Sequence, residues 1–365
     1  MALKKIRLGD YIVRSTKNNH NLEYGADLIV GVTNDGVFAN PRGENKDVNL
    51  KPYKIVNNGA FVYNPSRLNL GSIAYRTDGL CIVSHLYQIF YLNEEGKKII
   101  DPEWLFIYFR RKSFYREVTF RNFGSQRPEF NFNDMSEIII PLPDIDIQRK
   151  YAKVYKEMNN NLHSYEQGVE DLKLVCDGYI ETLRTHYPLR SLKFLLARRN
   201  ERNNDINAVY WGVSPDGFIN PKQKLSEGNI LHKKKFYYDD FIFTPSGANL
   251  HNKSIEAGVC SHVNEMFFIQ SNEVNSDYVE MWLKRSEFLR YCNFFNISSV
   301  MSNFDYDTLT DYFIPVPPMD IQKSIISIFK CFQERKRINE QLSEQIKNMC
   351  PVLIRGSIME AEGGN

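Results

Sequence analysis

The chain has 365 residues, a length that suits about two domains able to bury a core each. Its 46 basic and 44 acidic residues give a formal net charge of +2. This balance excludes one overall basic or acidic field, so any charged binding surface must be local. The six cysteines show no paired spacing, which argues against a disulfide scaffold and for reduced thiols. No signal segment and no run of about 18 apolar residues is present, so we expect a cytoplasmic protein without membrane contact.

Residues 1–143 are predicted to form a β-rich domain. Short aromatic and β-branched segments bounded by glycine, asparagine or proline predict strands at 59–65, 86–92 and 137–143. One amphipathic helix is expected after "DPEW", where Asp101 can accept hydrogen bonds from the free N–H groups of the first turn.

A long helix is predicted over residues 144–187. Pro141 and Pro143 end the preceding strand, and apolar residues then recur every three or four positions. The apolar stripe includes Tyr151, Val154, Met158 and Leu172. In the first turn, the Gln148 side chain either reaches back to the helix cap or is simply exposed.

The same order of elements follows a second time. Residues 188–318 are predicted to form another β-rich domain, with strands at 240–246, 265–271 and 312–317. Residues 319–357 then show a second helical stripe, before a polar tail at 358–365. That stripe includes Ile328, Phe332, Leu342 and Met349. Because a long helix with one apolar face must bury it on another element, we expect the two helices to pack together.

The second half of the chain repeats the first. "IPLPDIDIQ", which begins at Ile140, and "IPVPPMDIQ", which begins at Ile314, are separated by a constant offset of 174 residues. "FVYNPS" from Phe61 matches "FIFTPS" from Phe241 at an offset of 180 residues. A period this long exceeds the roughly 20–50 residues of solenoid and propeller repeats, so we infer a duplicated domain.

This order of domain, helix, domain, helix, with each helix entered through a P-x-P-x-x-x-x-Q phrase, resembles the specificity subunit of type I restriction-modification systems. The resemblance covers nearly the whole chain. It implies an α+β fold with two tandem target recognition domains, separated by two long helices packed as an antiparallel coiled coil with pseudo-two-fold symmetry.

The resemblance also implies a function and a set of partners. Each recognition domain would read one half of a bipartite, asymmetric site on double-stranded DNA. The helices would dock two methyltransferase subunits, and two restriction and translocation subunits would join the full complex. The chain itself would be non-catalytic and would bind neither cofactor nor metal, with S-adenosylmethionine held by the methyltransferase subunits.

Candidate DNA contacts lie in basic and amide-rich segments, since phosphates attract lysine and arginine while base edges favour small polar side chains. In the first domain the candidates are Arg67, Asn69, Arg76, Arg121, Ser125, Gln126 and Arg127. In the second they are Lys222, Lys224, Asn249, His251, Lys253, Ser298, Ser299 and Asn303. For the nearby Arg110 and Arg111, the alternative is that they only complement the end of a helix.

The sequence is also compatible with two other functions. One is a self-contained DNA methyltransferase or nuclease with an unrecognised site, which would require a cofactor fold of alternating strands and helices that the sequence does not display. The other is a specificity subunit that serves a fused methylase-nuclease. The first would transfer methyl groups without any partner.

Overall fold

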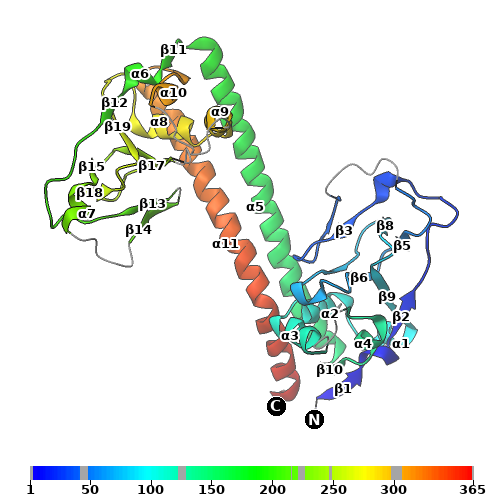
Figure 1. Cartoon of the computed structure of the whole chain (residues 1–365). Helices are drawn as coiled ribbons and strands as arrows, with labels where there is room; N and C mark the ends of the chain where they lie inside the picture. The colour runs from blue at the N-terminus through cyan, green and yellow to red at the C-terminus, as the bar shows by residue number, and fades with distance from the viewer. Residues whose placement is uncertain are drawn as a thin grey trace. The chain divides into compact units, whose positions relative to one another are not determined.

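The computed structural model describes residues 3–41, 48–121, 129–214, 216–220, 227–245, 249–296 and 306–363. The chain divides into two compact units (Figure 1). Unit 1 comprises residues 1–165 and 338–365, and unit 2 comprises residues 166–337. Each unit therefore contains one recognition domain together with a segment of each long helix.

Unit 1 is built around a four-stranded antiparallel sheet in the order β2-β9-β6-β7. Three two-stranded sheets accompany it: β1-β10, β3-β4 and β5-β8. The strands are β1 (Lys4–Arg7), β2 (Ile12–Ser15), β3 (Gly31–Val32), β4 (Phe38–Ala39), β5 (Lys54–Val56), β6 (Phe61–Tyr63), β7 (Ile73–Tyr75), β8 (Cys81–Val83), β9 (Gln88–Leu92) and β10 (Ile139–Leu142).

Helices and single turns accompany that sheet. They are α1 (Glu94–Ile99), α2 (Pro102–Phe109), α3 (Lys112–Arg121) and α4 (Phe132–Ser136), with single 3-10 turns η1 (Leu8–Asp10), η2 (Ala26–Leu28) and η3 (Leu68–Leu70). The core between sheet and helices is strongly aromatic: Phe61 stacks on Phe90, and Phe109 meets both rings edge-on. The expected capping is confirmed, because the Asp101 side chain accepts from the N–H of Trp104 at 2.9 Å.

Unit 2 repeats this topology strand for strand. Its four-stranded sheet has the order β12-β19-β16-β17, and its pairs are β11-β20, β13-β14 and β15-β18. The strands are β11 (Leu189–Ser191), β12 (Leu196–Arg199), β13 (Gly212–Ser214), β14 (Gly217–Ile219), β15 (Lys234–Tyr237), β16 (Phe241–Phe243), β17 (Asn249–His251), β18 (Ala257–Cys260), β19 (Glu265–Ile269) and β20 (Phe313–Pro315). The helices are α6 (Leu192–Leu195), α7 (Glu227–Leu231), α8 (Ser276–Leu283), α9 (Ser286–Asn296) and α10 (Tyr306–Thr310). The predicted domain duplication is confirmed.

Two long helices connect these elements, α5 (Ile145–His186) and α11 (Met319–Gly363). In unit 1, Ala152 near the start of α5 belongs to the same core as Leu353 and Ile354 near the end of α11. In unit 2, Ile180 near the end of α5 shares a core with Ile325 near the start of α11. The helices therefore run antiparallel in both units, as expected (Figure 1).

The structure differs from the expected helices in two respects. The single helix predicted inside each domain is a pair, α2 with α3 and α8 with α9. The second long helix continues to Gly363, although a polar tail was expected from residue 358. It stays helical because Ile358 packs on the core of unit 1 and the Glu360 carboxylate accepts hydrogen bonds from Lys150 and Tyr151 of α5.

Candidate nucleic-acid interface

The Arg67 and Asn69 side chains lie on an exposed turn of unit 1. Both residues are exposed, and neither side chain has a hydrogen bond or ion pair within the described residues. Gly71 ends the turn in the left-handed region, with φ +98°, where a side chain would be strained. Below the turn, the buried Ser72 hydroxyl donates to the Val32 carbonyl at 2.9 Å. The turn is thus held from below while its two polar side chains remain free to contact a ligand.

Arg110 and Arg111, between α2 and α3, are held inside the unit. Arg110 Nη1 donates to the Gly71 carbonyl at 2.5 Å and to the Asn34 carbonyl at 3.1 Å. Arg111 Nε donates to the Tyr108 carbonyl at 2.9 Å, and its guanidinium lies 3.6 Å from the centre of the Tyr108 ring. These contacts favour a structural role for both arginines over direct DNA contact.

The other described candidates of unit 1 have partial partners. Arg76 is half-buried, donates to the Gly79 carbonyl at 3.2 Å and lies over the Phe38 ring. Arg121 pairs with Glu117 one turn earlier on α3, at 3.0 Å. Such exposed pairs contribute little free energy, so a phosphate can replace the carboxylate. The predicted contacts Ser125, Gln126, Arg127, Lys222, Lys224, Ser298, Ser299 and Asn303 lie outside the described residues.

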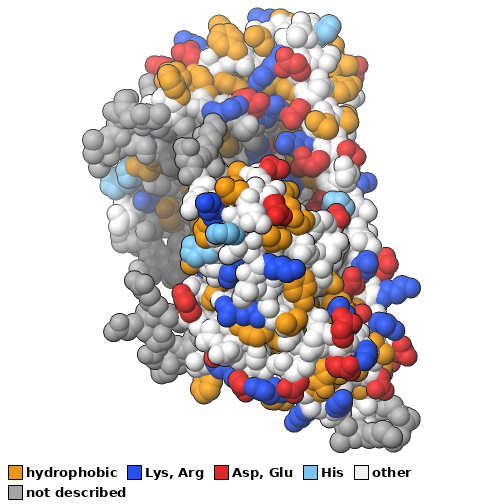
Figure 2. All heavy atoms as spheres, turned by 90° about the vertical axis from the view of Figure 1, so that its right-hand side faces the viewer, with side chains coloured by type: hydrophobic (Ala, Val, Ile, Leu, Met, Phe, Trp, Pro, Cys, Tyr) orange, Lys and Arg blue, Asp and Glu red, His pale blue; other side chains and the backbone are white. Residues whose placement is uncertain are grey.

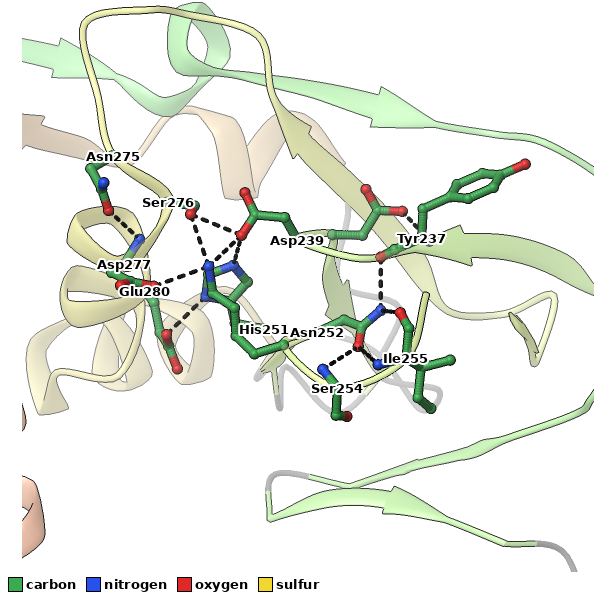
Figure 3. A network of polar contacts seen from close by, with 12 residues as sticks. Tyr237, Asp239, His251, Asn252, Ser254, Ile255, Asn275, Ser276, Asp277 and Glu280 are labelled. Atoms are coloured by element: carbon green, nitrogen blue, oxygen red, sulfur yellow. Dashed lines mark hydrogen bonds and ion pairs between the residues drawn. The ribbon is translucent and has the colours of Figure 1, made fainter. Parts of the chain in front are cut away.

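In unit 2, His251 and Lys253 belong to a polar network between β17 and α8 (Figure 3). The buried His251 ring lies between two carboxylates, with Nδ1 2.8 Å from Glu280 and Nε2 2.9 Å from Asp239. Lys253 contacts Asp239 and lies 3.0 Å from Asp277. Because their side chains are already engaged, the structure favours a positioning role for His251 and Lys253 over the predicted DNA contact.

The carboxylates of this network are held ionised. Burial raises the pKa of Glu280, but hydrogen bonds from His251 and Lys284 outweigh burial and hold that pKa below its ordinary value. Burial also raises the pKa of Asp239, but hydrogen bonds from Lys253, Ser276 and His251 outweigh burial and lower that pKa.

His251, Asp277 and Glu280 lie close enough to hold a metal ion, but Lys253 already supplies a cation there. The predicted contact Asn249 donates weakly to the Leu283 carbonyl, at 3.3 Å.

The predicted helix seam is mostly half-buried. The half-buried residues of the seam are Tyr151, Met158, Leu172, Ile328, Phe332, Leu342 and Met349. Val154 differs, because 46% of its surface is exposed and Ala152 and Tyr155 face the core of unit 1 instead. The three-four spacing of α5 is compatible with burial of the face that contains Val154 or of the face that contains Ala152. In the structure, α5 buries the face with Ala152 against unit 1.

Among the described residues on the face drawn in Figure 2, lysine and arginine are interspersed with aspartate and glutamate and do not gather in one large basic region. This distribution agrees with the small net charge and leaves local loops as the candidates. None of the helices in the described part of the chain is both long and apolar enough to cross a membrane.

Comparisons with known proteins agree with this architecture. The family model of the type I restriction modification DNA specificity domain matches twice, at residues 9–170 and 196–348. No curated protein matches the chain. Among solved structures, the type I restriction-modification system S subunit from M. genitalium aligns over 98% of this chain and 96% of its own, with 11% identity and a TM-score of 0.62.

A second solved structure, the HsdS subunit from Thermoanaerobacter tengcongensis, covers 97% of this chain and 96% of its own at 15% identity, with a TM-score of 0.44. Two units of one topology define a tandemly duplicated protein. The chain belongs to the type I restriction-modification DNA specificity family. It is accordingly a DNA sequence-recognition protein.

Proposed function

We propose that the chain is the specificity subunit of a type I restriction-modification complex, in which each unit reads one half of a bipartite DNA site. The observation that supports this proposal is that the two units share one strand topology but carry different side chains on it. The chain after β6 reads NPSR, which places the exposed Arg67 on the turn, whereas the chain after β16 reads TPSG. Two unlike recognition surfaces require an asymmetric site, since identical surfaces would read the same half-site twice.

The long helices supply the spacing in this proposal. The 42 residues of α5 extend over about 60 Å at about 1.5 Å per residue. One turn of DNA is about 34 Å, so half-sites more than one turn apart are compatible with a spacer of this length. Exposed apolar side chains on α5, such as Leu174 at 70% and Val175 at 50%, support docking of methyltransferase subunits on the helices.

The chemistry then belongs to the partners. In this proposal the chain is non-catalytic and binds no cofactor, and S-adenosylmethionine is held by two methyltransferase subunits. Two restriction and translocation subunits complete the cleaving form. A separate nuclease or a fused methylase-nuclease would use the same recognition chain.

The test is methylome sequencing of cells with and without the gene, alongside a variant altered only in unit 1, Asn69→Ala. We expect a methylated motif of two short words separated by a fixed gap, absent without the gene. The unit 1 variant should change one word and leave the other unchanged. Methyl transfer from labelled S-adenosylmethionine by the purified chain alone, or a palindromic motif, would contradict the proposal.

A further inference from the structure

Unit 2 contains a cluster of one carboxylate and two cations, and the equivalent place in unit 1 has the two cations without the carboxylate. In unit 2, the Glu265 carboxylate on β19 lies 2.6 Å from Arg198 Nε on β12 and 3.1 Å from Lys234 Nζ on β15. Lys234 also donates to the Asn264 carbonyl at 3.0 Å. One carboxylate thus offsets part of the charge of two neighbouring cations.

Unit 1 has Arg14, Lys54 and Gln88 in these three places. Arg14 on β2 pairs with Phe90 as Arg198 on β12 pairs with Phe267. Lys54 is the first residue of β5, as Lys234 is of β15, and it donates to the Tyr87 carbonyl at 2.6 Å. Gln88 begins β9 as Glu265 begins β19. The one chemical difference that changes the charge is therefore an amide in place of a carboxylate.

With the amide in this place, neither cation of unit 1 has an ion pair among the described residues. Arg14 is exposed, and its side chain makes no ion pair or hydrogen bond within the described ranges. Burial lowers the pKa of Lys54, and the positive charge of Arg14 lowers it further, so the two cations repel one another. The negative charge of Asp134 acts on the Tyr63 hydroxyl, and Asp134 Oδ2 accepts from the Asn131 N–H at 2.9 Å in the capping box of α4.

Two buried polar atoms beside these cations also lack partners. Gln88 Oε1 and Tyr63 Oη have no hydrogen-bond partner among the described atoms, and the two residues are paired directly across β9 and β6. In unit 2, Phe243 stands opposite Glu265, so this hydroxyl has no counterpart there. Buried polar atoms are normally satisfied. The Tyr63 hydroxyl can donate to a phosphate oxygen, whereas Gln88 Oε1 accepts only and would be satisfied by a water that accompanies the phosphate.

We propose that Arg14 and Lys54 form a DNA phosphate site of unit 1, and that Glu265 closes the equivalent place in unit 2. This inference rests on the proposed function. A phosphate carries the negative charge that the Glu265 carboxylate supplies in unit 2, and Arg14 presents the planar fork of donors that suits it. Because the contact is to the backbone, it sets the position of unit 1 on the duplex and not the bases it accepts.

The experiment measures binding of the full chain to a short duplex by fluorescence anisotropy at several salt concentrations. Gln88→Glu builds the neutralising carboxylate into unit 1, and Arg14→Ala removes the exposed cation. Each lost phosphate contact reduces the slope of log Kobs against log salt by about 0.9. We expect both variants to lose about that much, and Glu265→Gln to steepen the slope. Gln341→Glu, exposed on α11 in the same unit, adds the same charge elsewhere and should leave the slope unchanged.

The possible outcomes are distinct. A wild-type slope in both Gln88→Glu and Arg14→Ala would overturn the phosphate site while leaving DNA recognition intact. Failure of the wild-type chain to bind any duplex would instead count against the proposed function. Arg14 is exposed on the surface, so its variant folds and tests the site even if Gln88→Glu proves unstable. An equal loss with Gln341→Glu would attribute the effect to overall charge and also overturn the site.

Discussion

Gln148 and Gln322 make the same three hydrogen bonds in the two units. Both are fully buried at the start of a long helix. Gln148 Oε1 accepts from the Asp101 N–H at 2.9 Å, while its Nε2 donates to the carbonyls of Ile99 and Pro143. Gln322 does the same with Asn275, Glu273 and Pro317. Each glutamine reaches back past the start of its helix to Pro143 or Pro317, as one alternative expected for Gln148, but as a donor, and it also ties the long helix to its recognition domain.

Gln148→Ala should therefore loosen unit 1 locally. Three backbone groups lose their partner, and each buried group left unsatisfied costs about 1–3 kcal/mol. Hydrogen exchange should rise at the Asp101 amide and along α1 and α2, while amides of unit 2 stay protected. Gln322→Ala should do the reverse. Gln167→Ala, exposed on the same helix, is the control, and unchanged exchange at Asp101 would contradict the role.

Arg110 and Arg67 should separate structural from binding arginines. Arg110→Ala removes two charge-assisted hydrogen bonds to backbone carbonyls, so we expect the free energy of unfolding to fall by about 1.5–3 kcal/mol. Arg67→Ala removes no bond within the described structure and should change stability by less than about 0.5 kcal/mol while weakening binding to any duplex. Chemical denaturation and DNA-binding titrations measure the two effects. Equal stability losses would refute the distinction.

Asn69 should influence which bases are accepted. Its exposed amide sits on the same turn as Arg67, and an amide can both donate to and accept from a base edge. Asn69→Ala should reduce discrimination at one base pair by about 1–3 kcal/mol and leave the salt slope unchanged. Binding to a randomised duplex pool, followed by sequencing of the bound fraction, measures this. A uniform loss across all sequences would show a backbone contact instead.

The His251 network should make unit 2 sensitive to acid. The folded-state pKa of Glu280 lies below its ordinary value of 4.5, so its contribution to stability is complete above that value and is lost as pH falls through the lower folded-state pKa. Glu280→Gln should cost about 1–3 kcal/mol at pH 7 and progressively less below about pH 4.5. Denaturation at several pH values measures the difference. Glu256→Gln, exposed in the same unit, should show no such dependence.

The end of α11 should stabilise unit 1. Deletion of residues 358–365 removes Ile358 from the core and Glu360 from its bonds to Lys150 and Tyr151. We expect Tm to fall by about 2–4 °C for each kcal/mol lost, with the change localised by hydrogen exchange to unit 1. Glu362→Gln, exposed in the last turn, serves as the control. An unaltered Tm would show that residues 358–365 do not stabilise unit 1 and behave as the polar tail that the sequence predicted.

Much of the architecture was predictable because it depends on local pattern and on repetition. The strands at 59–65 and 240–246, the prolines before each long helix and the three-four apolar spacing are properties of neighbouring residues. The offset of 174 residues then showed that whatever fold the first half adopts, the second half adopts as well.

Side-chain partners could not be predicted in this way, because they are set by residues far apart in the chain. Glu280 meets His251 only when α8 packs beside β17, and Arg110 meets Gly71 only when α2 ends over the turn after η3. Basic residues that looked equally suited to DNA contact in the sequence are therefore of two kinds in the structure: some are held by internal hydrogen bonds, and others are exposed on the surface. Residue type and spacing determined the frame, whereas tertiary packing decided which polar groups remain available, because a hydrogen bond depends on distance in space and not along the chain.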